Sequence, residues 1–310
     1  HIFSKYPYYM KTALITGITS YIGTELAKKL SCNGVQVFVV IRPSSDKSLI
    51  PLCVDNECIY IHDGTTESMI KIVKLVKPDI VYHLASEYLI APNPQQIDSL
   101  LSSNIIFGAQ LLESLRLYGG PVKIIYTGTY AQYYDSNTAR PLNLYSVTKQ
   151  TFDNFLDYYK DAEGFVFSTL ILYDTYGPMD KRFKLLSSIY KAWKEKSIFS
   201  LPLDDIYVDM VYIKDVVSAL YRVYELQSLN ESSVNGKRFS VTSGVRYKIS
   251  EVVSIFEDVC KCSIKTKMGG YAMPKRKIIS PWIGETVPGW KSNTSLKNGI
   301  RMFINEQVGK

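Results

Sequence analysis

The sequence predicts an α/β fold, in which a Rossmann-type, doubly wound parallel sheet is followed by a smaller mixed C-terminal lobe. In about the first 170 residues, short apolar runs alternate with helical patterns, the order typical of a parallel sheet with crossover helices. Most of these runs lack polar residues at every second position, as strands buried on both faces do. After Pro178 the pattern changes to helices mixed with short strands. We therefore expect a tail at 1–10, a main domain at 11–178 with segments returning from 205–245, and a lobe at 179–310.

The order of elements follows from the periodicity of the apolar residues. Strands of the main domain are predicted at 13–16, 35–41, 59–62, 80–84, 123–127 and 166–172. Helices are predicted between them at 22–30, 68–75, 96–117 and 144–159. After Pro178, helices are expected at 183–194 and 213–226 with short strands at 207–211 and 238–241, and helices at 249–259 and 295–304 complete the C-terminal lobe.

The composition excludes several classes of protein. With 46% hydrophobic and 21% charged residues among 310, the chain is expected to bury a core and is not a disordered tail. The apolar run at 37–41 is far shorter than the roughly 20 residues that cross a bilayer. The segment 1–10 lacks the apolar stretch of a signal peptide. We expect a cytoplasmic protein that does not associate with a membrane.

The numbers and spacing of cysteines and histidines exclude several kinds of functional site. The five cysteines form no C-x-x-C pair, so neither a disulfide framework nor a zinc site is expected. Apart from His1 in the tail, the only histidines are His62 and His83, which excludes a histidine-rich metal centre, and no metal is expected. No G-x-S-x-G turn is present for a serine nucleophile. Proton transfer in an enzyme of this composition is expected to use another side chain.

The net charge of +7 comes from basic residues scattered along the chain. Proteins that bind nucleic acid usually have a basic stripe or a recognisable motif, and the sequence has neither. The charge is better explained by a small molecule with several phosphate groups.

The first predicted strand leads into a glycine-containing turn at 17–23, directly before the first helix. A glycine permits the tight turn, and the helix N-terminus offers free N–H groups to a phosphate. Ser20 stands where the full dinucleotide motif has its middle glycine, so an ordinary strand–helix turn is the alternative. The residues predicted to bind a cofactor here are Gly17, Thr19, Ser20, Tyr21, Ile22 and Gly23.

The residues after the second and third strands indicate which dinucleotide is bound. An NAD site usually has an acidic residue after the second strand, whereas this chain has Arg42, followed by Ser44 and Ser45. A guanidinium beside hydroxyl groups suits a 2′-phosphate, so NADP(H) is favoured over NAD. The alternative is a solvated arginine at a strand end. After the third strand, Asp63, next to Gly64, is a candidate acceptor for the adenine amine.

A Y-x-x-x-K pair, Tyr145 and Lys149, opens the predicted helix at 144–159. Residues four apart share a helix face, and a nearby ammonium is expected to lower the pKa of a phenol. With 24 tyrosines, about two such pairs arise by chance, and Tyr190 with Lys194 is another pair in this sequence. Tyr145 differs in its setting, because the preceding strand ends near the hydroxyl of Thr129. Ligands of open α/β sheets bind at that edge.

Taken together, these motifs resemble the extended short-chain dehydrogenases/reductases that act on nucleotide sugars, the NAD-dependent epimerase/dehydratase family. The resemblance runs from Lys11 to about Ile304. Besides the turn at 17–23, the matching segments are 79–85, Asn104 with Gly108 and 111–113, 176–178, 213–216 and 289–291. The resemblance implies that 11–178 binds NADP and that 179–310 binds a nucleotide sugar.

The resemblance also implies roles for single residues. Tyr145 would be the acid/base, Lys149 its cationic partner and ribose ligand, and Thr129 the hydroxyl that orients the substrate oxygen. His83 would be a strand-end residue beside the cofactor and not a base. Further cofactor contacts would come from Leu84, Ala85, Ser86, Asn104 and Thr127. Substrate contacts would come from Glu87, Thr129, Tyr130, Asp174, Lys181, Arg182 and Arg276.

Two residues depart from the pattern of the family. Val208 stands where an arginine often binds the nucleotide phosphates, and Asp174 stands where asparagine is common. Lys181 or Arg182 is a candidate to compensate. The helices at 96–117 and 144–159 carry apolar residues on more than one face, and the resemblance implies that they form a homodimer interface. Burial of these faces beneath the C-terminal lobe is the alternative.

The reaction is predicted from the same resemblance. The Asp-Glu pair of the 4,6-dehydratases is absent, because Tyr130 and Ala131 follow Thr129. Segments 144–150 and 271–290 resemble CDP-abequose and CDP-paratose synthases, which implies NADPH-dependent reduction of the C4 ketone of a nucleotide-linked 4-keto-deoxyhexose in deoxysugar biosynthesis for surface polysaccharide such as O-antigen. Two alternatives stay open: a nucleotide-sugar 4-epimerase with tightly bound NAD, and a non-catalytic NADP-binding sensor or scaffold.

Overall fold

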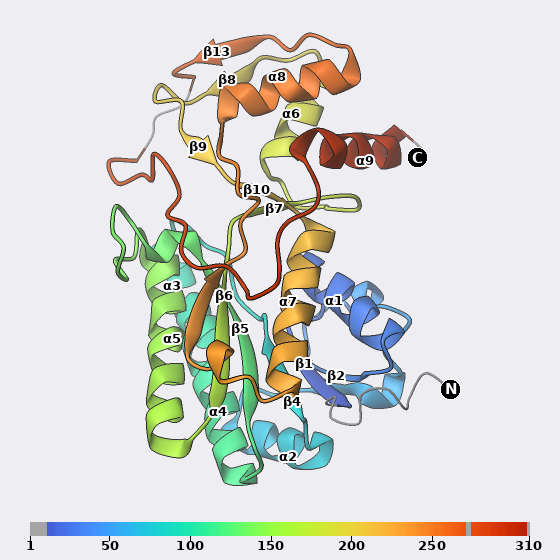
Figure 1. Cartoon of the computed structure of the whole chain (residues 1–310), viewed down its shortest axis with the longest axis vertical. Helices are drawn as coiled ribbons and strands as arrows, with labels where there is room; N and C mark the ends of the chain where they lie inside the picture. The colour runs from blue at the N-terminus through green and yellow to red at the C-terminus, as the bar shows by residue number, and fades with distance from the viewer. Residues whose placement is uncertain (1–10, 271–273, 309–310) are drawn as a thin grey trace.

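A computed structural model describes residues 11–270 and 274–308 and contains a central sheet of seven parallel strands (Figure 1). The order across the sheet is β3-β2-β1-β4-β5-β6-β11. The strands are β1 (Thr12–Thr16), β2 (Gln36–Ile41), β3 (Ile59–Ile61), β4 (Ile80–His83), β5 (Lys123–Thr129), β6 (Val166–Leu172) and β11 (Lys237–Ser240). The order reverses between β1 and β4, so the predicted doubly wound α/β fold is confirmed.

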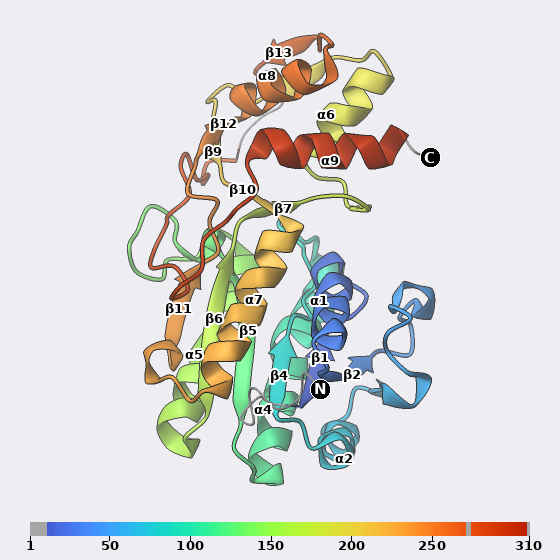
Figure 2. The same ribbon diagram turned by 45° about the vertical axis from the view of Figure 1, so that its right-hand side comes forward.

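Helices cover both faces of this sheet (Figures 1 and 2). One face packs against α1 (Tyr21–Cys32) and α7 (Ile213–Ser228), and the other packs against α2 (Thr66–Val76), α4 (Phe107–Tyr118) and α5 (Leu144–Glu163). Successive residues of β1 contribute to different cores, since Ala13 and Ile15 join the first and Leu14 the second. Burial on both faces explains why the strand sequences are continuously apolar.

The predicted helix at 96–117 is divided into three pieces. A short 3₁₀ turn, η3 (Pro94–Gln96), leads into α3 (Ile97–Leu101), the π-helical segment η4 (Ser102–Ile106) and α4. The wider π turn places Asn104 in the interior, while Ile106 stays exposed. Segments of this kind are found mostly at functional sites.

Further helices and short strands lie in the upper half of Figure 1. They are α6 (Leu185–Lys194), α8 (Ile249–Cys260), α9 (Leu296–Val308) and three strand pairs. The pairs are β7 (Asp174–Tyr176) with β10 (Met210–Tyr212), β9 (Tyr207–Val208) with β12 (Tyr247–Lys248), and β8 (Phe199–Leu201) with β13 (Thr266–Met268). The single strand predicted at 207–211 is wrong, because Asp209 separates β9 from β10.

Two segments that the sequence analysis names include residues that the structure does not describe. The proposed tail at 1–10, with His1, and the start of the segment 271–290 lie outside the described residues. Within the described part of the chain, no helix has the length and apolar character needed to cross a membrane.

Candidate active site

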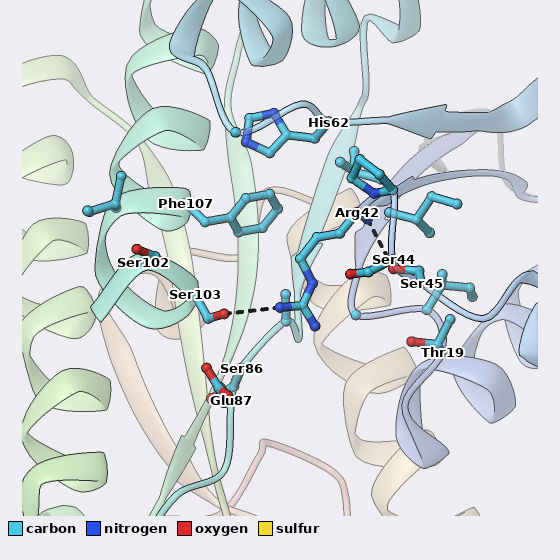
Figure 3. A pocket seen from close by; sticks show the side chains of 18 of the residues that line it. Thr19, Arg42, Ser44, Ser45, His62, Ser86, Glu87, Ser102, Ser103 and Phe107 are labelled. Carbon is cyan, nitrogen blue, oxygen red and sulfur yellow. Dashed lines mark hydrogen bonds between the residues drawn. The ribbon is translucent and has the colours of Figure 1, made fainter. Parts of the chain in front are cut away.

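A cavity of about 710 Å³ lies at the carboxyl ends of β1 to β4 (Figure 3). The predicted cofactor residues that line it are Gly17, Thr19, Ser20, Arg42, Ser44, Ser45, Asp63, Gly64, Leu84, Ala85 and Ser86. Glu87, predicted to bind substrate, also lines it. Segments far apart in the sequence therefore meet at one edge of the sheet, where ligands of such folds bind.

In the turn at 17–23, two glycines lie so close to neighbouring backbone atoms that no side chain fits there. Gly17 has a φ of +81°, and a Cβ atom there would lie 2.6 Å from the backbone nitrogen of Ala85. A Cβ atom on Gly23 would lie 2.2 Å from the carbonyl oxygen of Gly17. The Ser20 hydroxyl accepts a hydrogen bond from the Gly23 N–H at 3.0 Å and caps α1. The positive end of the α1 dipole therefore lies at the cavity, where a pyrophosphate fits.

Arg42 extends from the end of β2 into this cavity (Figure 3). Its Nη1 atom donates to the Ser103 hydroxyl at 3.4 Å, and its backbone N–H donates to the Ser45 hydroxyl at 3.0 Å. Ser44 lines the same wall. A cation surrounded by hydroxyl donors fits a phosphate group on the cofactor ribose. Ser103, from η4, is a member of this group that sequence reasoning missed.

Three further cavity residues, His62, Phe107 and Gln110, were also missed. The Gln110 amide nitrogen donates to the Gly64 carbonyl at 2.9 Å, so its oxygen faces His62 Nε2 at 3.1 Å. The Nε2 atom therefore carries the hydrogen, and burial lowers the pKa of His62, which keeps the ring neutral. Asp63 Oδ1 accepts from the Thr65 hydroxyl at 2.7 Å and from the Thr65 N–H at 2.9 Å, and these two hydrogen bonds hold the pKa of Asp63 below its usual value.

The first turn of α5 carries Tyr145. The helix begins here because Asn143 accepts a hydrogen bond from the Ser146 N–H at 2.9 Å in a capping box. Tyr145 is 9% exposed, and its burial raises the pKa of the phenol, an effect opposed by the Ser86 hydroxyl. The expected lowering of this pKa by Lys149 is wrong, because burial determines the direction of the shift and the Ser86 hydroxyl, not Lys149, opposes it. Tyr145 is therefore a neutral phenol with a proton to donate at neutral pH.

Lys149 lies one turn further along α5 and is 3% exposed. Its Nζ atom lies 4.4 Å from the centre of the Tyr126 ring. Burial lowers the pKa of Lys149 to about 7, and the buried Asp153 carboxylate, itself paired with Arg238, opposes that shift. An ammonium that titrates near neutral pH is poised for proton transfer.

Residues at the ends of β4 and β5 complete the site. Thr129 is half-buried, and its hydroxyl accepts from the Ala131 N–H at 3.3 Å. Thr127 is buried within β5. His83 is a neutral core residue, because burial lowers its pKa to about 3 and its Nδ1 atom lies 2.7 Å from the Thr16 hydroxyl.

Asn104 connects two parts of the site and does not line the cavity. Its Oδ1 atom accepts from the Glu87 N–H at 2.7 Å, and its Nδ2 atom donates to the Thr148 hydroxyl at 3.0 Å. Nδ2 also donates to the Glu87 carbonyl at 3.1 Å. The buried amide thus ties the loop after β4 to α5, and with it Ser86 to Tyr145.

A second group of side chains lies beside Tyr145. The Tyr88 ring meets the Tyr145 ring edge-on at 4.9 Å, and Lys184 Nζ lies 4.2 Å from the centre of the Tyr88 ring. Asp174 on β7 interacts electrostatically with Lys184, and burial raises the pKa of Asp174 to about 6. Asp174 in turn raises the pKa of Tyr130. Sequence reasoning named Asp174 and Tyr130 but missed Tyr88 and Lys184.

Other residues that were predicted to bind the cofactor or the substrate form contacts outside the cavity. The Tyr21 hydroxyl donates to the Pro178 carbonyl at 2.5 Å, and Tyr21, Ile22 and Gly23 do not line the cavity. Arg182 forms an ion pair with Asp180 at 2.8 Å and donates to the Thr175 carbonyl.

Two predicted cations lie on the surface or against a loop. Lys181 is exposed. Arg276 donates to the Pro141 carbonyl at 2.8 Å and lies 4.5 Å from the Tyr134 ring centre. Tyr190, from the chance Y-x-x-x-K pair, packs against Trp193 and Phe303, as a core residue does. Among residues 11–270 and 274–308, no cluster of histidine, cysteine or acidic side chains has the arrangement to hold a metal ion.

Comparison with known proteins places the chain in a family. CDP-abequose synthase of Salmonella muenchen is 24% identical over 302 residues, covering 95% of this chain and 97% of the relative. The enzyme of the same name from Yersinia pseudotuberculosis is 24% identical, covering 86% and 90%.

Solved structures share the fold. UDP-glucose 4-epimerase of Thermotoga maritima has a TM-score of 0.82 at 20% identity, covering 96% of this chain and 99% of that one. UDP-glucuronic acid 4-epimerase of Bacillus cereus has the same score at 19% identity and the same coverage. The sequence profile of the NAD dependent epimerase/dehydratase family matches residues 13–236, most of the chain. The chain therefore belongs to the NAD dependent epimerase/dehydratase family.

Proposed function

We propose that this protein is an oxidoreductase that uses NADPH to reduce the C4 ketone of a nucleotide-linked 4-keto-deoxyhexose, with CDP-4-keto-3,6-dideoxyglucose as the model substrate. The observation that carries the proposal is Arg42, held beside Ser44, Ser45 and Ser103 in the cofactor cavity. A cationic, hydroxyl-lined ribose site favours a cofactor with a 2′-phosphate. NADPH arrives reduced and leaves oxidised, which suits a net reduction. The CDP-abequose synthases among the relatives support the substrate class.

The cofactor would be held by residues of the cavity described above. The turn at 17–23 and the α1 N-terminus would bind its pyrophosphate, and Ala85 and Ser86 would lie beside its nicotinamide end. When bound, NADPH supplies a hydride to C4 of the sugar.

The side chains around Tyr145 would carry out the proton transfer to the substrate. Tyr145 is buried and neutral, so its phenol can donate a proton to the oxygen on C4 as negative charge develops there. Thr129, at the end of β5, would donate a hydrogen bond to the same oxygen and orient it. Lys149, with a pKa of about 7, would hold the ribose and return a proton to the Tyr145 phenolate.

The proposal is tested by mixing the purified protein with NADPH and a panel of 4-keto-deoxy nucleotide sugars. We expect loss of nicotinamide absorbance with at least one of them and a slower reaction with NADH. If none of the sugars oxidises NADPH, the proposed reduction is wrong.

A 4-epimerase with tightly bound NAD is the second candidate, because the structural neighbours include UDP-sugar 4-epimerases in complex with NAD. An epimerase returns the hydride to the sugar and consumes no cofactor. The two functions are separated by the nucleotide content of the purified protein, since an epimerase would carry NAD and convert substrate without added NADPH.

We further infer a place in cytoplasmic deoxysugar biosynthesis for surface polysaccharide and a homodimeric state. The support for the dimer is apolar surface on the helices expected to pair: Ile106, Leu117, Leu144, Val147 and Tyr158 are exposed on η4, α4 and α5.

A further inference from the structure

A row of side chains crosses the sheet beneath α5 and reaches the edge strand β11 (Figure 2). The register pairs His83 on β4 with Tyr126 on β5. It then pairs Tyr126 with Thr169 on β6, and Thr169 with Arg238 on β11. Paired residues point to the same face of a sheet, so these four side chains lie in line on the face that α5 covers. The row connects Arg238, at the edge of the sheet, to the interior beneath α5.

Lys149 and Asp153 lie one turn apart on α5 and face this row. Lys149 Nζ lies 4.4 Å from the centre of the Tyr126 ring, and the Tyr126 hydroxyl donates to the Lys149 carbonyl at 3.2 Å. The Thr169 hydroxyl donates to Asp153 Oδ1 at 2.6 Å. Lys149 is 3% exposed and Asp153 is 1% exposed. Because little water reaches either group, the charge of Asp153 acts strongly on Lys149.

Arg238 holds the Asp153 carboxylate in place. Its Nε atom donates to Asp153 Oδ2 at 2.8 Å, and its Nη2 atom donates to Asp157 Oδ2 at 2.7 Å. The Gly236 carbonyl accepts from Nη1 at 3.2 Å. Each oxygen of the Asp153 carboxylate is therefore hydrogen-bonded to a residue of β6 or β11. These charge-assisted bonds fix the carboxylate toward the edge of the sheet.

We propose that Arg238 is a positioning residue for the reaction. By holding the Asp153 carboxylate toward β11, Arg238 keeps its negative charge at a fixed place one helical turn from Lys149 and offsets part of that charge. Lys149 is then free to exchange a proton with Tyr145, instead of being held as an ammonium in an ion pair with Asp153. This inference rests on the proposed function for the roles of Tyr145 and Lys149.

The arrangement predicts opposite effects of the two charges on Lys149. Burial lowers the pKa of Lys149 to about 7, and the Asp153 carboxylate opposes that shift. Without the carboxylate, the pKa of Lys149 should fall by a further step of about one pH unit. Without Arg238, Lys149 becomes the cation that neutralises Asp153, so the pKa of Lys149 should rise by about as much.

The tyrosines and the histidine around Lys149 titrate away from neutral pH. The charged and titratable groups around Lys149 and Asp153 are His83, Tyr126, Tyr133, Tyr145, Asp157 and Arg238. Burial lowers the pKa of His83 to about 3 and raises the pKa of all three tyrosines above the usual value. A titration near pH 7 in this cluster is therefore expected to belong to Lys149.

The test measures NADPH affinity against pH for the wild type and for Asp153→Asn, Arg238→Met and Lys149→Met. Nicotinamide fluorescence gives the affinity between about pH 5.5 and 9, and no sugar is needed, because Lys149 is proposed to hold the cofactor ribose. We expect a wild-type inflection near pH 7 that moves to lower pH in Asp153→Asn and to higher pH in Arg238→Met. Lys149→Met should lose this inflection and keep only that of the cofactor phosphate. Arg238→Lys, which retains the charge, should restore most of the wild-type profile.

Arg222→Met and Asp215→Asn are the matched controls, because each removes a hydrogen-bonded charge from α7, on the opposite face of the sheet. Both should keep the wild-type inflection, since a loss of stability alone does not change the pH at which Lys149 titrates. The inference is overturned if Asp153→Asn or Arg238→Met leaves the inflection in place, if both move it in the same direction, or if Lys149→Met retains it. A wild-type protein that shows the expected shifts but oxidises no NADPH with any 4-keto sugar contradicts the proposed function instead.

Discussion

At the scale of single residues, the proposed chemistry depends on the hydroxyl of Tyr145. Replacing it with phenylalanine keeps the buried ring and its edge-on contact with Tyr88 but removes the proton donor. We expect kcat to fall about 10²- to 10⁴-fold while the affinity for NADPH is retained. Tyr190→Phe is the matched control, because Tyr190 has a lysine at the same spacing but packs against Trp193. Steady-state kinetics decide the outcome, and near-normal turnover of Tyr145→Phe would remove this residue from the mechanism.

Arg42 is expected to determine the choice of cofactor. Its guanidinium lies in the cavity beside Ser103, and a charge-assisted pair with a phosphate contributes roughly 1.5–3 kcal/mol. The Arg42→Ala variant should therefore lose about 10- to 100-fold in kcat/KM for NADPH and little for NADH. The Arg301→Ala variant, on the surface of α9, controls for the loss of a positive charge. Equal losses with both cofactors would show that Arg42 does not recognise a phosphate.

The sequence predicted some residues of the site and missed others, for physical reasons. Gly17, Arg42 and Asp63 were found because each follows a strand of the sheet, and strand ends have fixed places in a parallel sheet. Ser103 and Gln110 were missed because they come from a helix whose π turn sets which side chains face the cavity. Tyr88 and Lys184 lie at irregular positions, where no periodicity indicates the direction of a side chain.

At the scale of elements, the start of α5 positions Tyr145. The Asn143 side chain caps this helix, and replacing such a cap with alanine typically costs about 1 kcal/mol of unfolding free energy. The Asn143→Ala variant should show this loss in urea denaturation and a lower kcat, because the frayed first turn carries Tyr145. Asn137→Ala, in an exposed loop, should change neither quantity. A destabilised variant with normal kcat would show that the cap does not position Tyr145.

The predicted elements agree with the structure where burial on both faces of the sheet produces a continuous apolar run. Apolar runs buried on both faces were recognised as β1, β2 and β4 to β6. The short strands β7, β8, β12 and β13 were missed because two or three residues give no periodicity. Their pairing depends on partners far along the chain, as between β8 and β13.

At the scale of the whole molecule, the exposed apolar faces of α4 and α5 predict self-association. We expect light scattering to give the mass of a dimer. Val147→Asp, which puts a charge on the exposed face of α5, should give a monomer. The same change at another exposed apolar residue, Leu203→Asp, should not. A wild-type monomer at micromolar concentration would contradict the dimer.

The fate of the hydride tests the central proposal most directly. NADPH carrying deuterium at the transferred position is incubated with the protein and CDP-4-keto-3,6-dideoxyglucose, and the product is examined by NMR and mass spectrometry. We predict one deuterium at C4 of the sugar for each NADPH oxidised. A product without deuterium, formed while NADPH is not consumed, would contradict the assignment of this protein as a reductase.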